Sequence, residues 1–304
     1  HAAVLANIEF HAGRPWPLDV ALWDLAGRIR DEPVWSLTGG HGSRIRTYAS
    51  SGVQRPPAEM VGLARTVLAS GFPALKVRLG RPTLADDLAV IRAIRDAVGD
   101  ELDLMVDCNQ GWRMPWDTAP AWDVDHATEV AHQLEAERVY WMEEPLHRGD
   151  YEGHTELRRR VGIRIAGGEL TREAFEFREL LERDCLDVFQ PDCVFTQGIS
   201  GLRHLAHTVI AAGKAFTPHT WGNGIGLLAN AHLTAGTVGA EALELLEFPF
   251  DPPEWSTARR DFVLTEPIEV DGDGWLDLGD RPGLGCHLDE DALARTASAT
   301  ATFT

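Results

Sequence analysis

The clearest shortage in the sequence is of positive charge. Its 304 residues include 28 lysines and arginines against 47 aspartates and glutamates, which gives a net charge of −19. Binding to nucleic acid or to an anionic membrane without sequence preference requires a basic surface. We therefore expect neither nucleic acid nor a membrane among the partners of this protein.

Paired cysteines and long apolar runs are also missing. The four cysteines form no Cys-x-x-Cys pair and no dense disulfide-like spacing, which is typical of a protein from a reducing compartment. No run reaches the roughly 18 consecutive apolar residues of a membrane span. The first residues also lack the charged-then-apolar pattern of a signal peptide. These absences predict a cytoplasmic protein.

A glycine-rich phosphate loop is a further absence. No GxGxxG motif follows an early apolar run, and GNGIG at 222–226 comes late and lacks that spacing. We interpret it as a tight loop. This argues against a doubly wound open sheet, which is the main alternative architecture for a chain of this length.

The sequence does contain a repeating β-then-α pattern. Short apolar runs alternate with amphipathic stretches such as 84–98, where apolar residues recur at helical spacing and Gly99 follows. Near-continuous apolar strands separated by helices indicate parallel βα units. Eight units predict an α/β fold, a (β/α)8 barrel. The predicted strands are 45–50, 74–79, 102–109, 139–145, 163–169, 185–192, 214–219 and 242–248.

The two ends of the chain do not fit this pattern. Residues 17–29 form an amphipathic helix, and 38–43 (TGGHGS) reads as a linker into the first strand. After the barrel comes a proline-rich stretch of strands and turns. We therefore divide the chain into 1–43, a barrel over 44–255, and 256–304, with both ends belonging to a second, smaller unit.

Charged side chains close most of the predicted strands. Because the carboxyl ends of the strands in such a barrel meet at one mouth, we expect these groups to converge there. Asp107, Glu143 and Glu169 end three successive strands. Three crowded carboxylates repel one another unless a cation lies between them. All three candidate ligands are carboxylates and none of these strand ends has a paired histidine, so the sequence predicts a hard divalent cation, Mg²⁺ first and Mn²⁺ next.

Other polar residues at this end complete a candidate site. Asp192 and His219 end neighbouring strands, and a carboxylate beside an imidazole makes a tuned base. Asn109 shares a face with Asp107 and is expected to orient the metal ligands or touch substrate. Lys76 and Arg78 share a face in an apolar run, so they require an anionic partner.

As a set, these motifs resemble the enolase superfamily, in its mandelate racemase subgroup. The residues that carry the resemblance are KVR (76–78), VDCN (106–109), EEP (143–145), GGE (167–169), QPD (190–192), PHTW (218–221), LLEF (245–248) and PGLG (282–285). The resemblance implies a barrel capped by an α+β domain built from both chain ends. Residues 1–43 would be the remaining helices of its N-terminal part, and 256–304 would return to it.

The resemblance also implies a reaction. Asp107, Glu143 and Glu169 would bind Mg²⁺, which would bind the carboxylate of a small-molecule acid. A base would then remove the proton alpha to that carboxylate and give an enediolate. His219, oriented by Asp192, would stand on one face of the substrate. Lys76 and Arg78 would stand on the other, and Glu247 would hydrogen-bond the substrate. Relatives of this kind are commonly homo-oligomers.

Arg78 departs from the family pattern. In racemases of this subgroup a second lysine is the second base, whereas arginine, with a pKa above about 12, is a poor base. This favours one-base chemistry: a hydro-lyase that dehydrates a sugar acid to a 2-keto-3-deoxy acid. The alternative is a racemase or epimerase of a 2-hydroxy acid or amino-acid derivative. A third hypothesis is a non-catalytic acid-binding barrel.

Overall fold

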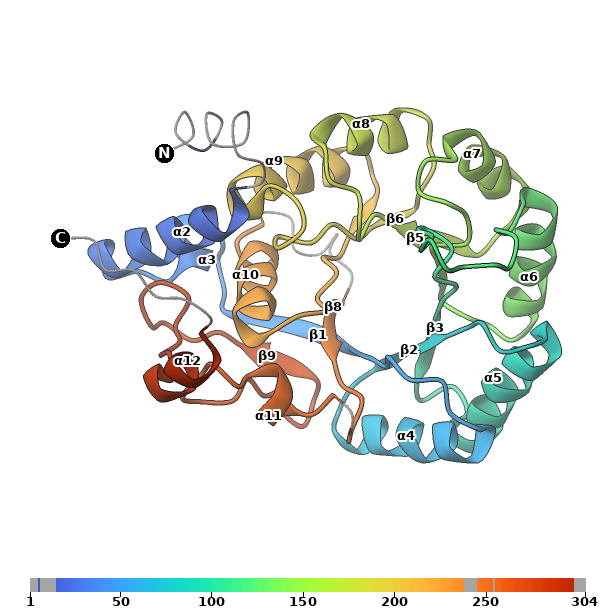
Figure 1. Cartoon of the computed structure of the whole chain (residues 1–304), viewed down its shortest axis with the longest axis horizontal. Helices are drawn as coiled ribbons and strands as arrows, with labels where there is room; N and C mark the ends of the chain where they lie inside the picture. Colours follow the sequence, from blue (N-terminus) through green and yellow to red (C-terminus); the bar gives the residue numbers. More distant parts are fainter. Residues whose placement is uncertain (1–4, 6–14, 238–244, 254, 298–304) are drawn as a thin grey trace.

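A ring of parallel strands surrounded by helices forms the centre of the molecule (Figure 1). The computed structural model describes residues 5, 15–237, 245–253 and 255–297. Hydrogen-bonded neighbours follow the order β7-β6-β5-β4-β3-β2-β1-β8, and all of these pairs are parallel. The strands are β1 (Arg44–Ser50), β2 (Ala74–Arg78), β3 (Asp103–Asp107), β4 (Trp141–Glu143), β5 (Arg164–Gly167), β6 (Val188–Phe189), β7 (Ala215–Phe216) and β8 (Leu246–Pro249). The predicted α/β barrel is thus confirmed.

A helix follows each of the first seven strands, and the pattern in 84–98 is indeed a helix. Thr83 caps this helix by accepting a hydrogen bond from the Asp86 amide. The barrel helices are α4 (Pro57–Ala69), α5 (Leu84–Val98), α6 (Val124–Ala136), α7 (Tyr151–Arg160), α8 (Ala174–Glu182), α9 (Gly198–Ala211) and α10 (Gly224–Ala235). Their apolar faces pack on the outside of the strands, which gives one continuous core.

Except for β1, the observed strands are shorter than the predicted apolar runs. Pro191 and Pro218 follow β6 and β7 closely, and proline cannot donate a backbone hydrogen bond to a neighbouring strand. The start of the eighth predicted strand, 242–244, lies outside the described residues. Next to the described parts of β7 and β8, the Thr217 hydroxyl donates to the backbone carbonyl of Leu245 at 2.5 Å.

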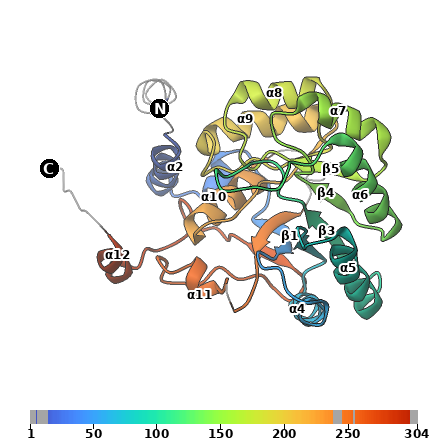
Figure 2. The same cartoon turned by 45° about the vertical axis from the view of Figure 1, so that its right-hand side comes forward.

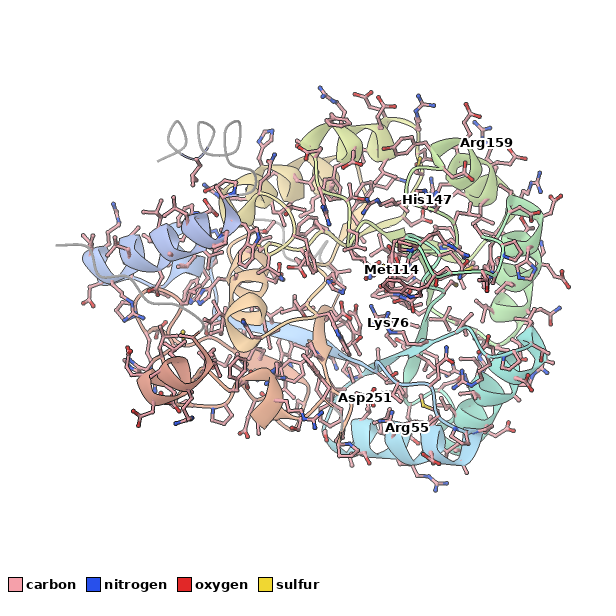
Figure 3. The ribbon with its side chains drawn as sticks, in the orientation of Figure 1. Arg55, Lys76, Met114, His147, Arg159 and Asp251 are labelled. Carbon is pink, nitrogen blue, oxygen red and sulfur yellow. The ribbon has the colours of Figure 1, made fainter. Side chains whose placement is uncertain are left out.

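The inside of the barrel is divided into an apolar and a polar layer. A buried apolar cluster takes one side chain from each of β1 to β6, namely Tyr48, Ala74, Met105, Trp141, Ala166 and Val188. Residues two positions apart on a strand share a face. The next inward side chains therefore lie nearer the carboxyl ends of the strands, and they are polar: Lys76, Asp107, Glu143, Gln190, Thr217 and Glu247. In Figure 3, Lys76 lies within the ring of strands, whereas Arg159 of α7 points outward.

The interpretation of GNGIG as a tight loop is wrong. Asn223 is the N-cap of α10, and its side chain accepts hydrogen bonds from the amides of Ile225 and Gly226. An asparagine in this position satisfies amides that have no partner inside the helix. Only Gly222 and Asn223 precede the helix, so most of this segment is its first turn.

The two ends of the chain pack against each other. The N-terminal helices α2 (Trp16–Arg30) and α3 (Val34–Leu37) lie on the same side of the barrel as α12 (Glu290–Thr296) (Figures 1 and 2). The amide of Val34 donates to the Gly283 carbonyl at 2.9 Å, and the amide of Gly283 donates to the Glu32 carbonyl at 3.0 Å.

The C-terminal segment also contains α11 (Thr257–Arg260) and β9 (Trp275–Asp277), which pairs antiparallel with β1. These contacts agree with one unit built from both ends. Its boundaries at residues 43 and 255, and its assignment as a capping domain, stay predictions. Among the described residues, every helix is too short or too polar to cross a membrane.

The burial of His232 on α10 makes the stability of the folded protein depend on pH. Its Nδ1 accepts a hydrogen bond from the Trp35 amide at 3.1 Å, and burial lowers the pKa of His232 to about 4. Because the unfolded chain binds this proton more tightly, the His232 contribution to stability is complete above about pH 6.5 and is lost as the pH falls toward 4. His232→Gln keeps an acceptor but cannot titrate.

Between pH 7 and 4, urea unfolding should show wild type losing about 3 kcal/mol more than His232→Gln. His204→Gln changes an exposed histidine on α9 and should follow wild type. Parallel stability curves for wild type and His232→Gln would contradict the prediction.

Candidate active site

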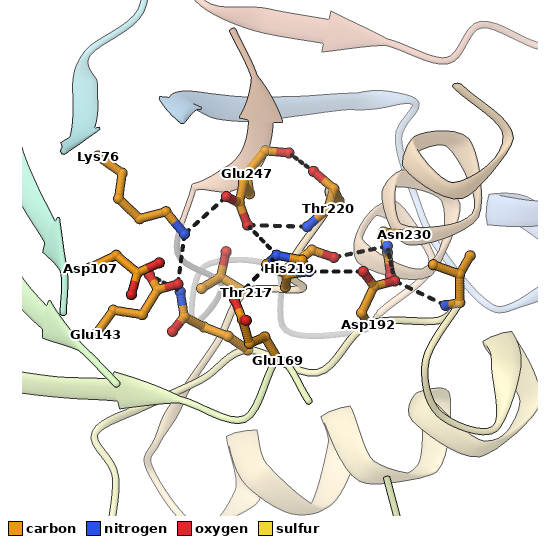
Figure 4. A network of polar contacts seen from close by, with 12 residues as sticks. Lys76, Asp107, Glu143, Glu169, Asp192, Thr217, His219, Thr220, Asn230 and Glu247 are labelled. Atoms are coloured by element: carbon orange, nitrogen blue, oxygen red, sulfur yellow. Dashed lines mark hydrogen bonds and ion pairs between the residues drawn. The ribbon is translucent and has the colours of Figure 1, made fainter. Parts of the chain in front are cut away.

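Lys76 is the centre of the polar layer inside the barrel (Figure 4). Its Nζ lies 2.7 Å from Glu143 Oε1 and 2.9 Å from Glu247 Oε1, and all three side chains are fully buried. A buried charge is tolerated when it is paired, and removal of one partner leaves the others uncompensated. The lysine therefore joins β2 to β4 and β8 and allows two carboxylates to share the barrel interior.

The protonation of these groups follows from their pairing. Burial would lower the pKa of Lys76, but Glu143 and Glu247 outweigh it and hold this pKa well above its ordinary value. Burial raises the pKa of Glu143 to about 7, although Lys76 opposes the increase. For Glu247, burial is outweighed by Lys76 and His219, which lower its pKa to about 2. Glu247 is thus ionised and accepts hydrogen bonds, including one from the Thr220 amide at 3.1 Å.

Arg78 lies at the end of β2, nearer the mouth. Its guanidinium pairs with Asp107 and lies over the Trp221 ring, with Cζ 5.4 Å from the ring centroid. Burial by itself lowers the pKa of Arg78, but Asp107 and the other carboxylates raise it above its already high value. Asn109 is predicted to orient the metal ligands. Its backbone N–H donates to Asp107 Oδ1 at 2.8 Å, and its side-chain Nδ2 donates to Asp107 Oδ2 at 3.1 Å.

The structure brings Asp192 and His219 together as the sequence predicts. His219 Nδ1 lies 2.9 Å from Asp192 Oδ2, so Nε2 is left to face the carboxylates of the site. Nε2 lies 3.3 Å from Glu169 Oε2 and 4.0 Å from Glu247 Oε2. Burial lowers the pKa of His219, yet Glu169, Glu247 and Asp192 raise it to about 10.

The three predicted metal ligands form one cluster. Oxygen atoms of Asp107, Glu143 and Glu169 lie within 4.8 Å of one another, and all three residues are buried. Counted with Asp192 and Glu247, five carboxylates face three cationic groups: Lys76, Arg78 and protonated His219. The carboxylates outnumber the cationic groups, so a divalent ion would offset their mutual repulsion, and its preferred ligands are carboxylate oxygens. The residues therefore fit a metal site.

A cavity of about 690 Å³ opens above this cluster. Its walls combine polar groups of the predicted site with aromatic rings and the loop after β1. The lining residues are Gly52, Val53, Gln54, Arg78, Asn109, Trp112, Glu169, Leu170, Phe195, His219 and Trp221. Lys76 and Glu247 are absent from this lining, because they lie deeper in the barrel. Their predicted contact with substrate stays a prediction.

Three residues that contribute to the site were not predicted from the sequence. Gln190 Nε2 donates to Glu143 Oε2 at 2.8 Å, and the Thr220 hydroxyl donates to the Glu247 carbonyl. Asn230 on α10 contacts both Asp192 and His219. Two of the three had a signal in the sequence: Gln190 is two positions beyond the inward-facing Val188, and Asn230 interrupts the apolar run GLLANAHL.

Known proteins resemble this chain over most of its length. The model of the "Enolase C-terminal domain-like" family matches residues 59–292. Arabinonate dehydratase of Saccharolobus solfataricus is 28% identical over 88% of this chain and 68% of its own length. The 3,6-anhydro-alpha-L-galactonate cycloisomerase of Streptomyces coelicolor is 31% identical over 92% of this chain and 71% of its own length.

Solved structures also resemble this chain over most of its length. A racemase from Streptomyces coelicolor A3(2) with bound magnesium superposes with a TM-score of 0.78 at 30% identity, over 91% of this chain and 70% of that one. The chain spans 55 to 71% of the length of the curated relatives it matches. Together with the barrel and its three carboxylates, these likenesses show that the chain belongs to the enolase superfamily, in its mandelate racemase subgroup.

Proposed function

We propose that this protein dehydrates a sugar acid to a 2-keto-3-deoxy acid in a Mg²⁺-dependent reaction. The observation that carries the proposal is the pairing of groups around the cavity. One imidazole, His219, has its Nδ1 fixed by Asp192 and its Nε2 at the carboxylate cluster, whereas the residue at the end of β2 is Arg78. The similarity to a sugar-acid dehydratase supports the same reaction class.

The residues suggest a one-base reaction. When bound by Asp107, Glu143 and Glu169, the divalent ion supplies positive charge that stabilises the negative charge developing on the substrate carboxylate. Glu169, which contributes most to raising the pKa of His219, is one of the proposed metal ligands, so a bound divalent ion would lower this pKa and leave Nε2 free to accept a proton. His219 Nε2 then takes the proton alpha to the carboxylate, and Asp192 stabilises the imidazolium through Nδ1. The electron pair of the C–H bond forms the C=C bond as the β-hydroxyl departs. Protonated His219 donates to that hydroxyl, which leaves as water, and the enol product tautomerises to the keto acid.

Arg78 has a different role in this scheme. Its high pKa keeps the guanidinium protonated, so it stabilises negative charge at the cavity wall and does not remove a proton. Lys76 holds Glu143 and Glu247 in place and, together with Asn109 and Glu247, belongs to the proposed substrate-binding set. To donate a hydrogen bond to a substrate anion, Glu247 would have to gain a proton that its low pKa disfavours.

Loss of one carboxylate should weaken the metal site. Asp107→Asn and Glu169→Gln each remove one anionic ligand, so we expect Mg²⁺ affinity to fall by at least about 10-fold. Isothermal titration calorimetry with Mg²⁺ measures this directly. Asp103→Asn is the matched control, because Asp103 is exposed at the opposite end of the same strand. Equal affinities in all four proteins would show that the cluster does not bind Mg²⁺.

Turnover of sugar acids tests the reaction itself. With Mg²⁺ and a panel of sugar acids in D₂O, we expect a keto acid that reacts with semicarbazide. His219→Asn should lower kcat by about 10²- to 10⁴-fold, because the proton acceptor is lost. His204→Asn, an exposed histidine on α9, should retain the wild-type rate. Deuterium exchange into both epimers without keto acid would instead show a racemase or epimerase.

Arg78→Lys tests whether the reaction uses a single base because residue 78 is an arginine. A lysine at this position can lose its proton, so the variant should place deuterium in the epimer of the substrate at least about 10-fold faster than wild type. Proton NMR of the recovered acid in D₂O provides the measurement. Arg81→Lys is the control, because Arg81 pairs with Asp87 and is not part of the cavity wall. A folded, active Arg78→Lys enzyme without this exchange would show that residue 78 does not reach the α-carbon.

The proposal also covers the compartment, assembly and metal preference of the enzyme. We infer a cytoplasmic homo-oligomer that acts on a small-molecule acid and accepts Mn²⁺ in place of Mg²⁺. The division into a barrel over 44–255 and a partial capping unit formed by 1–43 and 256–304 belongs to the same proposal. The packing of Val34 against Gly283 supports the association of the two ends.

A further inference from the structure

Asn230 is a fully buried amide in the middle of α10, a helix whose other buried positions are largely apolar. Such a group is costly inside a protein unless its donors and acceptor all have partners. Here they do. Nδ2 donates to Asp192 Oδ1 at 2.8 Å and to the His219 carbonyl at 3.0 Å, and Oδ1 accepts from the Cys193 amide at 2.9 Å.

These three hydrogen bonds join the segments that carry the acid–base pair. Asp192 and Cys193 follow β6, His219 follows β7, and Asn230 reaches both from the helix after β7 (Figure 4). Asp192 Oδ1 accepts from Asn230 Nδ2 and from the Val194 amide at 2.9 Å. With Oδ1 held by two donors, Oδ2 is directed at His219 Nδ1, 2.9 Å away.

We propose that Asn230 is a positioning residue for the Asp192–His219 pair, acting through the Asp192 carboxylate and the His219 backbone to aim Nε2 at the substrate cavity. This inference rests on the proposed function for its catalytic consequence, but its structural part concerns the protein alone. A purely structural role for Asn230 would need only Oδ1, which satisfies the Cys193 amide. The two bonds from Nδ2 both end on the acid–base pair.

The test replaces the amide by an apolar side chain of similar size. Asn230→Leu removes both Nδ2 donors, and with them the Oδ1 acceptor of the Cys193 amide, so Asp192 can rotate away from Nδ1. We expect kcat to fall by about 10- to 100-fold, as is usual when a residue that orients a functional group is lost, with KM within about 2-fold of wild type. Thr234→Val is the matched control: Thr234 is buried one turn further along α10, and its hydroxyl donates to the Asn230 carbonyl, away from the pair.

A second readout does not depend on turnover. The Nδ1 proton shared by His219 and Asp192 is expected to give a downfield proton NMR resonance, identified by its absence in His219→Asn. In metal-free protein this resonance should disappear or shift upfield in Asn230→Leu and persist in Thr234→Val. Thermal unfolding of each variant checks that the protein is folded. If Asn230→Leu does not fold, Asn230→Ser gives a smaller change with the same two readouts.

The outcomes are distinct. Loss of the resonance together with the fall in kcat supports the positioning role. A wild-type resonance in a folded Asn230 variant overturns it, whatever the change in kcat, because the pair is then held without the amide. If wild-type protein turns over no sugar acid, the proposed function fails, and the resonance alone still decides whether Asn230 positions the pair.

Discussion

The burial of several carboxylates at one end of a barrel is the constraint on which the rest of this structure depends. Glu143, Glu247 and Asp192 are fully buried, and each costs several kcal/mol to remove from water unless it is compensated. The compensation comes from other elements of the fold: Lys76 from β2 and His219 from the segment after β7. The site therefore exists only when distant parts of the chain have assembled.

The pleat of the strands explains why this charge is gathered in one layer. Met105 and Trp141 belong to the buried apolar cluster inside the barrel. Asp107 and Glu143 lie two residues further along the same strands, so they share the inward face. This apolar cluster closes the barrel below the polar layer, and the cavity opens above it. A low-dielectric floor strengthens each charge interaction in the layer above it, which is the condition under which fixed charges are most effective in stabilising a developing anion.

Support for the polar groups of the site, including the Asp192–His219 pair, extends beyond the barrel strands. Asn230 donates a hydrogen bond to Asp192 and Gln190 donates one to Glu143, although neither donor lines the cavity. Each bond limits the rotation of the carboxylate that accepts it. This division separates residues that line the cavity from those that hold them in place.

The sequence by itself determined the eight-unit barrel, the three clustered carboxylates and the Asp192–His219 pair, because strand periodicity and the residues that end each strand are local properties of the chain. Its error at GNGIG was also local, since Asn223 acts as a helix cap. Only the tertiary structure decided that Lys76 lies beneath the cavity between Glu143 and Glu247, that Arg78 pairs with Asp107 at the mouth, and that Asn230 reaches the pair from α10. Those partners are far apart in the chain, and the closure of the barrel sets which of them meet.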